Sequence, residues 1–216
     1  MNEAPAASGS ILRPGLVFAL SGPAGSGKTA LVEGLRALEP SMYFCVTATT
    51  RAPRPGEIDG VDYFFLSEAD FLDRVAREEF LEHARVPPLV GNFYGSPSQP
   101  VLDAVDAGRD VFLQVDVQGA RSIRLRLPTV TTIFLRPPDV GMLQHRLRKR
   151  GTESTADVER RLANALVEMD CEPEFDYCVV NADGGLDEAI AEVQAIIALK
   201  RQAAGRGDPV EPAPHG

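Results

Sequence analysis

The chain has 216 residues, of which 44% are hydrophobic, and its formal net charge is −9 with a calculated isoelectric point of about 4.9. This length is enough for one domain with a sizeable core. The excess of acidic residues argues against a nucleic acid or an anionic membrane as the main partner, because binding either requires an excess of Lys and Arg.

The three cysteines, Cys45, Cys171 and Cys178, are too few and too irregularly spaced for a disulfide framework or a zinc site. No apolar run approaches the length of a membrane span, and the N-terminus lacks the charged and apolar regions of a signal peptide. We therefore expect a protein of the reducing cytoplasm that has no membrane partner.

The two ends of the chain, residues 1–14 and 205–216, are rich in Ala, Gly and Pro and show no apolar periodicity. We expect both to be disordered tails. Residues 15–204 between them contain no internal repeat and are expected to form one domain.

The domain starts with an apolar run, Leu16–Leu20, which is typical of a buried parallel strand. The glycine-rich segment that follows fits the pattern G-x-x-x-x-G-K-[ST], whose backbone N–H groups and following helix bind phosphate. It reads Gly22-Pro23-Ala24-Gly25-Ser26-Gly27-Lys28-Thr29. We expect a helix to begin near Lys28, the Lys28 ammonium to reach the β- and γ-phosphates of a nucleotide, and the Thr29 hydroxyl to bind Mg²⁺.

Further apolar runs predict strands at 42–47, 111–115, 130–135 and 177–180, with helical patterns between them. The alternation predicts an α/β fold in which helices flank a parallel sheet. Residues 51–95 fit this alternation poorly, because they combine a Pro- and Gly-rich loop with short strands at 63–66 and 80–86. We expect a small mixed α/β sub-domain, inserted over about 48–96, that holds a second substrate.

Several helices carry boundary signals or an apolar face. Ser67-Glu68-Ala69-Asp70 is typical of a capping box that opens a helix extending to about Arg77, and Gly108 is expected to end a helix that begins near Ser98. Two later segments place apolar residues on one face: Val158, Leu162, Leu166 and Met169, and then Leu186, Ile190, Val193 and Ile197. We expect both faces to lie in the core.

A triphosphate site alone is compatible with a motor protein, a GTPase or a kinase. Arg51 and Arg54 lie three residues apart in a proline-stiffened loop, and paired guanidinium groups suit a phosphate dianion. Tyr63 and Tyr94 offer phenolic donors for the same group. Taken singly, the arginines are equally compatible with a solvated loop, and the tyrosines with a core.

Two carboxylates, Glu82 and Asp116, have no cationic partner nearby in the sequence. A carboxylate that faces the N1–H and N2–H₂ donors of guanine would select guanine over adenine. The hydroxyl groups of Thr47 and Ser96 suit the O6 and N7 acceptors of the same base. Alone, Glu82 is also compatible with a surface charge on a strand.

Six motifs that follow the phosphate-binding segment resemble those of the guanylate kinase family, in order and from about Leu16 to Leu199. They are T-T-R-A-P-R-P-G-E-x-D-G-x-D-Y-F-F, E-F-L-E, G-N-F-Y-G-S, V-D-V-Q-G-A-R, R-G-T-E-S and F-D-Y-x-V-V-N. Members of this family transfer the γ-phosphoryl group of ATP to GMP with Mg²⁺, giving ADP and GDP. The resemblance implies a P-loop core with a GMP-binding insertion and a helical lid.

The resemblance also implies roles for individual residues. It assigns the phosphate of GMP to Arg51, Arg54, Tyr63 and Tyr94, and guanine to Thr47, Glu82, Ser96 and Asp116. It places a mobile lid over about 141–170, whose Arg146, Arg150 and Arg161 close on the transferring phosphoryl group beside Lys28.

The residues of the lid agree with that role. Arg146 and Arg150 are spaced i,i+4 and share a helix face, and Gly151 would break the helix. A closing basic lid would supply positive charge and exclude water, which is a competing acceptor. The alternative is an exposed basic end of a helix.

The chain departs from the family pattern at four places. Thr47 stands where serine is usual, and Phe93 replaces the first of two tyrosines. Gln114 stands where an aspartate is usual at a strand end, and a neutral amide cannot help to hold Mg²⁺ as a carboxylate would. After Glu82 the chain carries a few extra residues around Pro87-Pro88, which affects how Glu82 itself is placed.

The sequence thus indicates a guanylate kinase of purine nucleotide metabolism that acts on ATP and GMP, as a monomer or a small homo-oligomer. One alternative is a guanylate-kinase-like module that binds a nucleotide or a protein without catalysis; the intact Gly27-Lys28-Thr29 opposes it and Gln114 weakly favours it. The other is a kinase of the same fold with a different phosphorylated acceptor, which Glu82 and Asp116 oppose.

Overall fold

The structure, a computed structural model, describes residues 13–86, 91–149 and 155–206. Most of each predicted tail therefore lies outside the described residues. Arg206, expected in the C-terminal tail, instead hydrogen-bonds to the Asp110 carboxylate and to the carbonyl of Gly108. The contacts of the domain thus extend slightly beyond the expected boundary at residue 204, because this cation finds a buried partner.

The core is a parallel sheet of five strands in the order β2-β7-β1-β8-β9. The strands are β1 (Val17–Ser21), β2 (Tyr43–Phe44), β7 (Val111–Gln114), β8 (Thr131–Arg136) and β9 (Tyr177–Val180). All five correspond to predicted strands, but β2 is much shorter than the predicted 42–47. The reason is that the chain leaves this sheet after Phe44, and its next residues pair in a second sheet.

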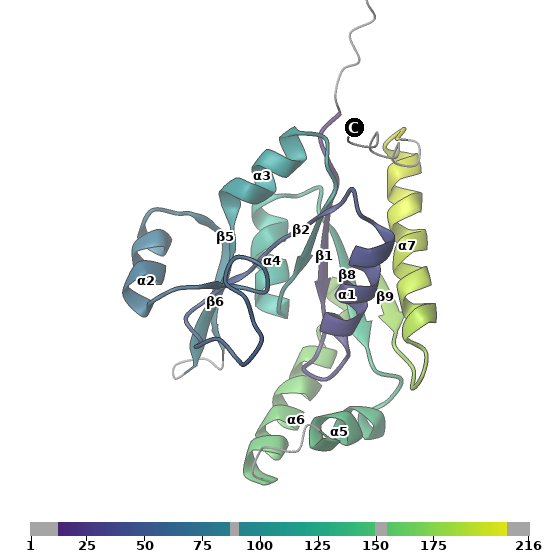
Figure 1. The fold of residues 1–216 in the computed structure, drawn as a ribbon. Helices are drawn as coiled ribbons and strands as arrows, with labels where there is room; N and C mark the ends of the chain where they lie inside the picture. Colours follow the sequence, from purple (N-terminus) through teal and green to yellow (C-terminus); the bar gives the residue numbers. More distant parts are fainter. Residues whose placement is uncertain (1–12, 87–90, 150–154, 207–216) are drawn as a thin grey trace, which may run out of the picture.

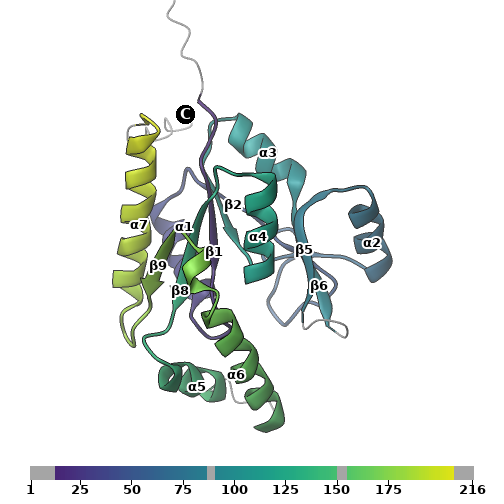
Figure 2. The same cartoon turned by 180° about the vertical axis from the view of Figure 1, so that it is seen from behind.

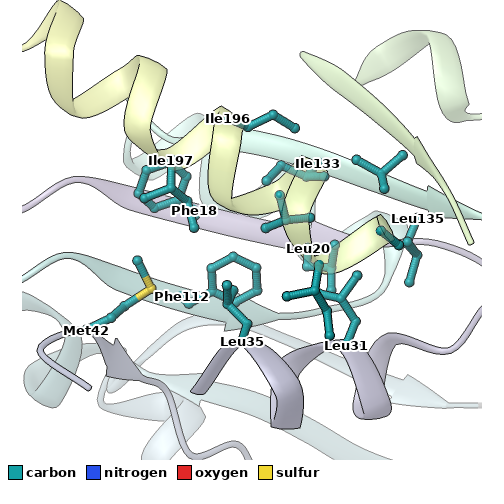
Figure 3. Close-up of a cluster of buried hydrophobic side chains, with 14 of the residues drawn as sticks. Phe18, Leu20, Leu31, Leu35, Met42, Phe112, Ile133, Leu135, Ile196 and Ile197 are labelled. Atoms are coloured by element: carbon teal, nitrogen blue, oxygen red, sulfur yellow. The ribbon is translucent and has the colours of Figure 1, made fainter. Parts of the chain in front are cut away.

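Helices cover both faces of the parallel sheet (Figures 1 and 2). Along β1, Phe18 and Leu20 point to one face, and Val17 and Ala19 point to the other, as the two-residue period of a strand requires. The first face packs against α1 (Lys28–Leu38) and α7 (Leu186–Ala203), as Figure 3 shows. The second face packs against α3 (Ser98–Asp106) and α4 (Val117–Arg126).

A second, mixed sheet of four strands lies beside the core in the order β4-β3-β6-β5 (Figure 1). Its strands are β3 (Ala48–Thr49), β4 (Phe64–Phe65), β5 (Phe80–Val86) and β6 (Asn92–Pro97). Helix α2 (Glu68–Ala76) packs on it through Phe71, which stacks on Phe80 at 4.6 Å between ring centroids. The predicted helix start is confirmed, because the Ser67 hydroxyl accepts a 3.0 Å hydrogen bond from Asp70 N–H.

Two helices, α5 (Val140–Lys149) and α6 (Thr155–Met169), extend beyond the carboxyl ends of the parallel strands, and the 3₁₀ turn η1 (Glu172–Glu174) follows them (Figure 1). The expected burial of the apolar face of α6 is only partly right. Leu162 and Met169 pack against Leu143 and Ala165, but Leu166 is 38% exposed and the Val158 side chain lies outside the described part. The face is partly uncovered because α5 is the main neighbour of α6 at this edge.

The other predicted apolar face, on α7, is confirmed. Ile190, Val193 and Ile197 are buried in the core, and Leu186 packs at its edge. Among the described residues, no helix combines the length and the apolar character needed to cross a bilayer.

Candidate active site

The glycine-rich segment forms the loop between β1 and α1, at the carboxyl edge of the parallel sheet. Successive strands of the chain are added on opposite sides of β1, so this edge is a topological switch point, where α/β sheets bind ligands. Gly22, Gly25 and Gly27 have φ values of 143°, 90° and 99°. A Cβ atom at Gly22 would lie 2.1 Å from the carbonyl oxygen of Leu135, so only glycine fits there.

Lys28 and Thr29 open helix α1. The Lys28 ammonium folds back over the loop and donates to the carbonyl oxygens of Gly22 and Pro23, at 2.5 and 3.1 Å. Thr29 is exposed in the first turn. A phosphate placed here would meet the positive end of the helix and a cation that is hydrogen-bonded to neutral carbonyl groups.

Asn181, at the end of β9, supports the loop from behind. Its Nδ2 donates to the carbonyl oxygen of Ser26 at 2.8 Å. A Cβ atom at Gly27 would lie only 2.3 Å from the same Nδ2 atom, so the two residues pack without room for a side chain at Gly27. The sequence reasoning gave Asn181 no role. The only signal was its place at the end of the motif F-D-Y-x-V-V-N, since the contact joins residues 155 positions apart.

The lid arginines are only partly described. Arg146, on α5, donates to the carbonyl oxygens of Ser26, Asn181 and Ala182 at 3.4, 3.1 and 2.9 Å. Arg161, on α6, is half-buried. Arg150, as well as the helix break expected at Gly151, lies outside the described residues.

A second group of predicted residues gathers at the mixed sheet. The Arg51 guanidinium lies over the rings of Tyr63 and Phe65, with 5.2 and 5.7 Å to their centroids. Tyr63 and Tyr94 meet edge to face at 6.3 Å between centroids, and Tyr94 lies close enough to Arg51 to raise its pKa. Arg51, Tyr63 and Tyr94 are thus brought together.

The sequence reasoning missed the partner of Arg51, which is Glu57. Its two carboxylate oxygens accept from Nη1 and Nη2 of Arg51, both at 2.9 Å, and this bond raises the pKa of Arg51. One of them also accepts from the backbone N–H of Arg54 at 2.7 Å, while the Arg54 residue is exposed. Glu57 belongs to the motif that carries both arginines, so its proximity was visible in the sequence, but the bidentate pairing was not.

The two predicted carboxylates approach each other at the boundary between the mixed sheet and the core. Glu82 is 7% exposed and accepts a 2.6 Å hydrogen bond from the Ser96 hydroxyl. Burial raises the pKa of Glu82 to about 7; the Ser96 bond lowers it and the nearby Asp116 raises it. Asp116 caps α4, because its Oδ1 accepts from Gly119 N–H at 2.6 Å.

Strand pairing fixes where these residues lie. Glu82 stands opposite Ser96 in the β5–β6 pair, and Pro87-Pro88 lies outside the described residues. Thr47 is half-buried and directly precedes Ala48, whose partner Gly95 is the neighbour of Ser96. Thr47, Glu82 and Ser96 therefore share one end of the small sheet, while Asp116, the fourth residue predicted to recognise guanine, lies at the start of α4.

The structure shows the surroundings of two residues that depart from the family pattern, Phe93 and Gln114. Phe93 lies in the core of the mixed sheet, stacked on Phe71 at 5.2 Å between ring centroids. Gln114 is half-buried at the end of β7, beside Leu20 of β1 and therefore close to the start of the phosphate-binding loop.

The donor set suits a hard cation that is shared with a nucleotide. Within the described ranges, no cluster of three or more His, Cys, Asp or Glu side chains could hold a metal ion on its own. Thr29 offers an exposed hydroxyl oxygen at the loop, and Mg²⁺ commonly completes its octahedral shell with phosphate and water oxygens.

Comparisons with known proteins agree on one family. The sequence model of the family described as guanylate kinase matches residues 16–200. A guanylate kinase of Synechococcus elongatus is 43% identical over 183 residues, covering 85% of this chain and 97% of its own length. One of Paramagnetospirillum magneticum is 44% identical over 192 residues, covering 88% of this chain and 87% of its own length. The crystal structure of guanylate kinase from Anaplasma phagocytophilum superposes with a TM-score of 0.68 at 30% identity, covering 87% of this chain and 86% of that chain.

Proposed function

The chain belongs to the guanylate kinase family and is an ATP:GMP phosphotransferase, and we propose that the two groups of residues described above are its donor and acceptor sites. The donor site is the loop Gly22–Thr29, and the acceptor site is the mixed sheet with its arginine-bearing loop. The observation that carries this assignment is the pairing of Glu82 with Ser96 on the same small sheet as Arg51, Tyr63 and Tyr94.

At the donor site, the loop N–H groups and the start of α1 bind the phosphates of ATP, and Lys28 moves from the loop carbonyls onto the β- and γ-phosphates. Thr29 would hold Mg²⁺, which supplies charge neutralisation at the transferring phosphoryl group when bound. Gln114 contributes no charge to this ion.

At the acceptor site, Arg51, Arg54, Tyr63 and Tyr94 bind the phosphate of GMP. The Arg51 fork is held by Glu57 and by two aromatic faces, so it is oriented before the substrate arrives. Ionised Glu82 accepts from the N1–H and N2–H₂ groups of guanine, while the remaining predicted residues, Thr47, Ser96 and Asp116, complete the contacts to the base.

Phosphoryl transfer requires placement and charge more than covalent chemistry by the protein. Arg146, Arg150 and Arg161 supply positive charge over the transferring group, and the two helices that carry them exclude water. Support for this comes from Arg146, which already contacts the phosphate-binding loop through Ser26.

We further propose that the enzyme works in the cytoplasm on free nucleotides, as a monomer or a small homo-oligomer without nucleic acid. The acidic net charge of −9 supports this, and so do the free thiols of Cys45, Cys171 and Cys178, which suit a reducing compartment.

The test is ADP production from ATP and Mg²⁺ by the purified protein, with GMP, AMP, UMP and CMP as separate acceptors and a control without acceptor. We expect turnover with GMP and little with the others. Equal turnover with AMP would contradict the assignment of Glu82. Absence of turnover in a folded protein that still binds GMP would show that Gln114 is not tolerated, and Gln114→Asp would be the variant to measure next.

A further inference from the structure

The last turn of α6 carries a half-buried carboxylate, Glu168, that contacts the phosphate-binding loop. Its Oε2 accepts a 3.2 Å hydrogen bond from the backbone N–H of Ala24, the third residue of the glycine-rich segment. The two residues are 144 positions apart, so the bond is a tertiary link between the lid helix and the loop. None of the roles proposed for the donor and acceptor sites involves Glu168.

Charged groups from two other elements act on this carboxylate. Burial raises the pKa of Glu168 above its ordinary value, Lys28 and the Ala24 N–H group lower it, and Asp116 raises it. Lys28 belongs to the donor site, whereas Asp116 caps α4 beside the acceptor site. Glu168 therefore lies where the lid helix meets the donor site.

Helix α5 holds the same loop through a different peptide group. Arg146 donates to the carbonyl oxygen of Ser26, two residues after Ala24. Ala24 itself packs against Leu143 of α5 and Ala165 of α6. The loop thus accepts a hydrogen bond from α5 and donates one to α6. The position of each helix relative to the loop is therefore fixed by a hydrogen bond to a loop peptide group.

Arg161 and Glu168 are seven residues apart on α6. Seven residues make two turns, about 10.5 Å along the axis, so the two side chains leave the helix on the same face. A rotation of α6 would move both together. With Glu168 fixed on Ala24, the direction in which Arg161 leaves the helix is also fixed.

We propose that Glu168 is a positioning residue that couples α6, and through it Arg161, to the phosphate-binding loop. The inference rests on the proposed role of Arg161 in the transfer. Glu168 touches the protein and not the reacting group. Its effect is to hold α6, and with it Arg161, in a fixed place against the phosphate-binding loop.

The first test is kinetic. Glu168→Ala should lower kcat by about 10- to 100-fold, because a hydrogen bond to a charged group is lost, while KM for GMP stays within about twofold. Glu168→Gln keeps an oxygen acceptor for Ala24 N–H and should restore kcat to within about threefold of wild type. Asp170→Asn removes an exposed carboxylate just beyond α6 and serves as the matched control, with wild-type values expected.

The second test does not depend on activity. In the nucleotide-free protein, amide hydrogen exchange of residues 159–169 should be about tenfold faster in Glu168→Ala than in wild type, Glu168→Gln or Asp170→Asn. The third test is a double-mutant cycle. In a protein that already carries Arg161→Ala, Glu168→Ala should lower kcat no further, because its effect passes through Arg161.

Unchanged kcat and exchange in Glu168→Ala would overturn the inference, and so would losses that multiply in the double variant. If Glu168→Ala does not fold, Glu168→Asp, which is too short to reach Ala24, takes its place with the same expected outcome. Wild-type kcat in Arg161→Ala would instead overturn the proposed role of Arg161, and the exchange result would still report on the link between α6 and the loop.

Discussion

Lys28 and the acceptor residues lie on separate elements, so changes at Lys28 should separate turnover from acceptor binding. Its ammonium is hydrogen-bonded to the loop, and the GMP contacts are assigned to the mixed sheet. Lys28→Ala should lower kcat by at least about 100-fold, because a preorganised cation at the transferring phosphates is lost. The dissociation constant of GMP, measured by calorimetry, should stay within about twofold.

The control is Lys200→Ala, which removes a lysine of α7 that lies over the ring of Tyr177. This variant should keep wild-type kcat. Loss of GMP binding by a folded Lys28→Ala protein would contradict the assignment of two separate sites.

Burial raises the pKa of Glu82 to about 7, and guanine requires its ionised form. Binding of GMP should therefore release a proton below pH 7, and the affinity should fall by about tenfold per pH unit in that range. Glu82→Gln should bind GMP more weakly, lose preference over AMP and lack this part of the pH dependence. The phosphate of GMP titrates in both proteins, so the ratio of the two dissociation constants between pH 5.5 and 8 isolates the contribution of Glu82.

The raised pKa of Glu82 also makes the stability of the protein depend on pH. The folded-state pKa of Glu82 is raised from 4.5, so the stabilisation from the protonated carboxyl is complete below about pH 4.5 and is lost as the pH rises through about 7. Relative to Glu82→Gln, the wild type should lose roughly 3 kcal/mol of unfolding free energy over this range. Denaturant unfolding at several pH values measures it, and parallel curves for the two proteins would show that folding does not raise the pKa of Glu82.

Residue types and motifs predicted the candidate groups, but not their partners. The guanidinium pair Arg51 and Arg54 was visible in the sequence, whereas the bidentate pairing of Glu57 and the contact of Glu168 became evident only from the structure. The bond of Glu168 to Ala24 depends on how α6 crosses the loop, and no local pattern encodes that crossing. Side chains that act through tertiary contacts are therefore the ones that sequence reasoning misses.

Among the elements, α4 approaches the acceptor site most closely from the core. Gly119, in its first turn, leaves room for the Glu82 carboxylate, because a Cβ atom there would lie 2.8 Å from Oε2. Gly119→Ala should push that carboxylate away from Ser96 and weaken GMP binding by about tenfold, since its hydrogen bond is strained. Alanine favours the helix by up to about 1 kcal/mol, so the fold should persist.

Gln118→Ala, at an exposed position of the same helix, is the control and should bind GMP as the wild type does. Calorimetry gives the affinity, and circular dichroism confirms that the helices remain. Unchanged GMP binding by Gly119→Ala would mean that the carboxylate moves without cost and that α4 does not shape the site.

Most elements were predictable because their signals are local. Strand β5 has the predicted bounds Phe80–Val86, and α2 begins after Ser67 as its capping box indicates. The run predicted as one strand, 42–47, contains only the two-residue strand β2, and β3 begins directly after it at Ala48. The hydrophobic pattern does not show where the chain passes from one sheet to the other. The burial of α6 was overestimated at Leu166 for a related reason, because periodicity shows a face but not whether a neighbour covers it.

At the scale of the whole molecule, the alternation of strands and helices predicted a parallel sheet but not the order of its strands. That β1 lies between β7 and β8 follows from long-range pairing, such as Ala19 beside Leu113 and Thr132. This order is what places the phosphate-binding loop at a switch point with the mixed sheet on one side and α5 and α6 beyond it (Figure 1). The active site is thus a property of the topology as much as of the motifs.

A buried ion network joins the last helix to the start of the sheet. Arg201 of α7 is 6% exposed and bonds to Asp110 at 2.7 Å and to Glu39 at 2.9 Å. Asp110 also accepts from the backbone N–H of Leu16 at 2.9 Å, next to β1. The network therefore ties the C-terminal helix to the strand that leads into the active-site loop.

Removing Arg201 takes away the guanidinium that Glu39 and Asp110 share, and leaves Asp110 with Arg206. Arg201→Ala should lower the free energy of unfolding by about 3–5 kcal/mol. Arg77→Ala, which breaks an exposed pair with Asp73, should cost less than about 1 kcal/mol and is the matched control. Arg201 lies in the last turn of α7, and this end of the helix lies away from the start of α1 (Figure 2), so KM for GMP should be unchanged in the folded fraction of both variants. The measurement is denaturant unfolding of both variants. An equal loss of unfolding free energy in the two would mean that water reaches Asp110 and Glu39 once the guanidinium is gone. Apolar packing alone would then hold α7 in place.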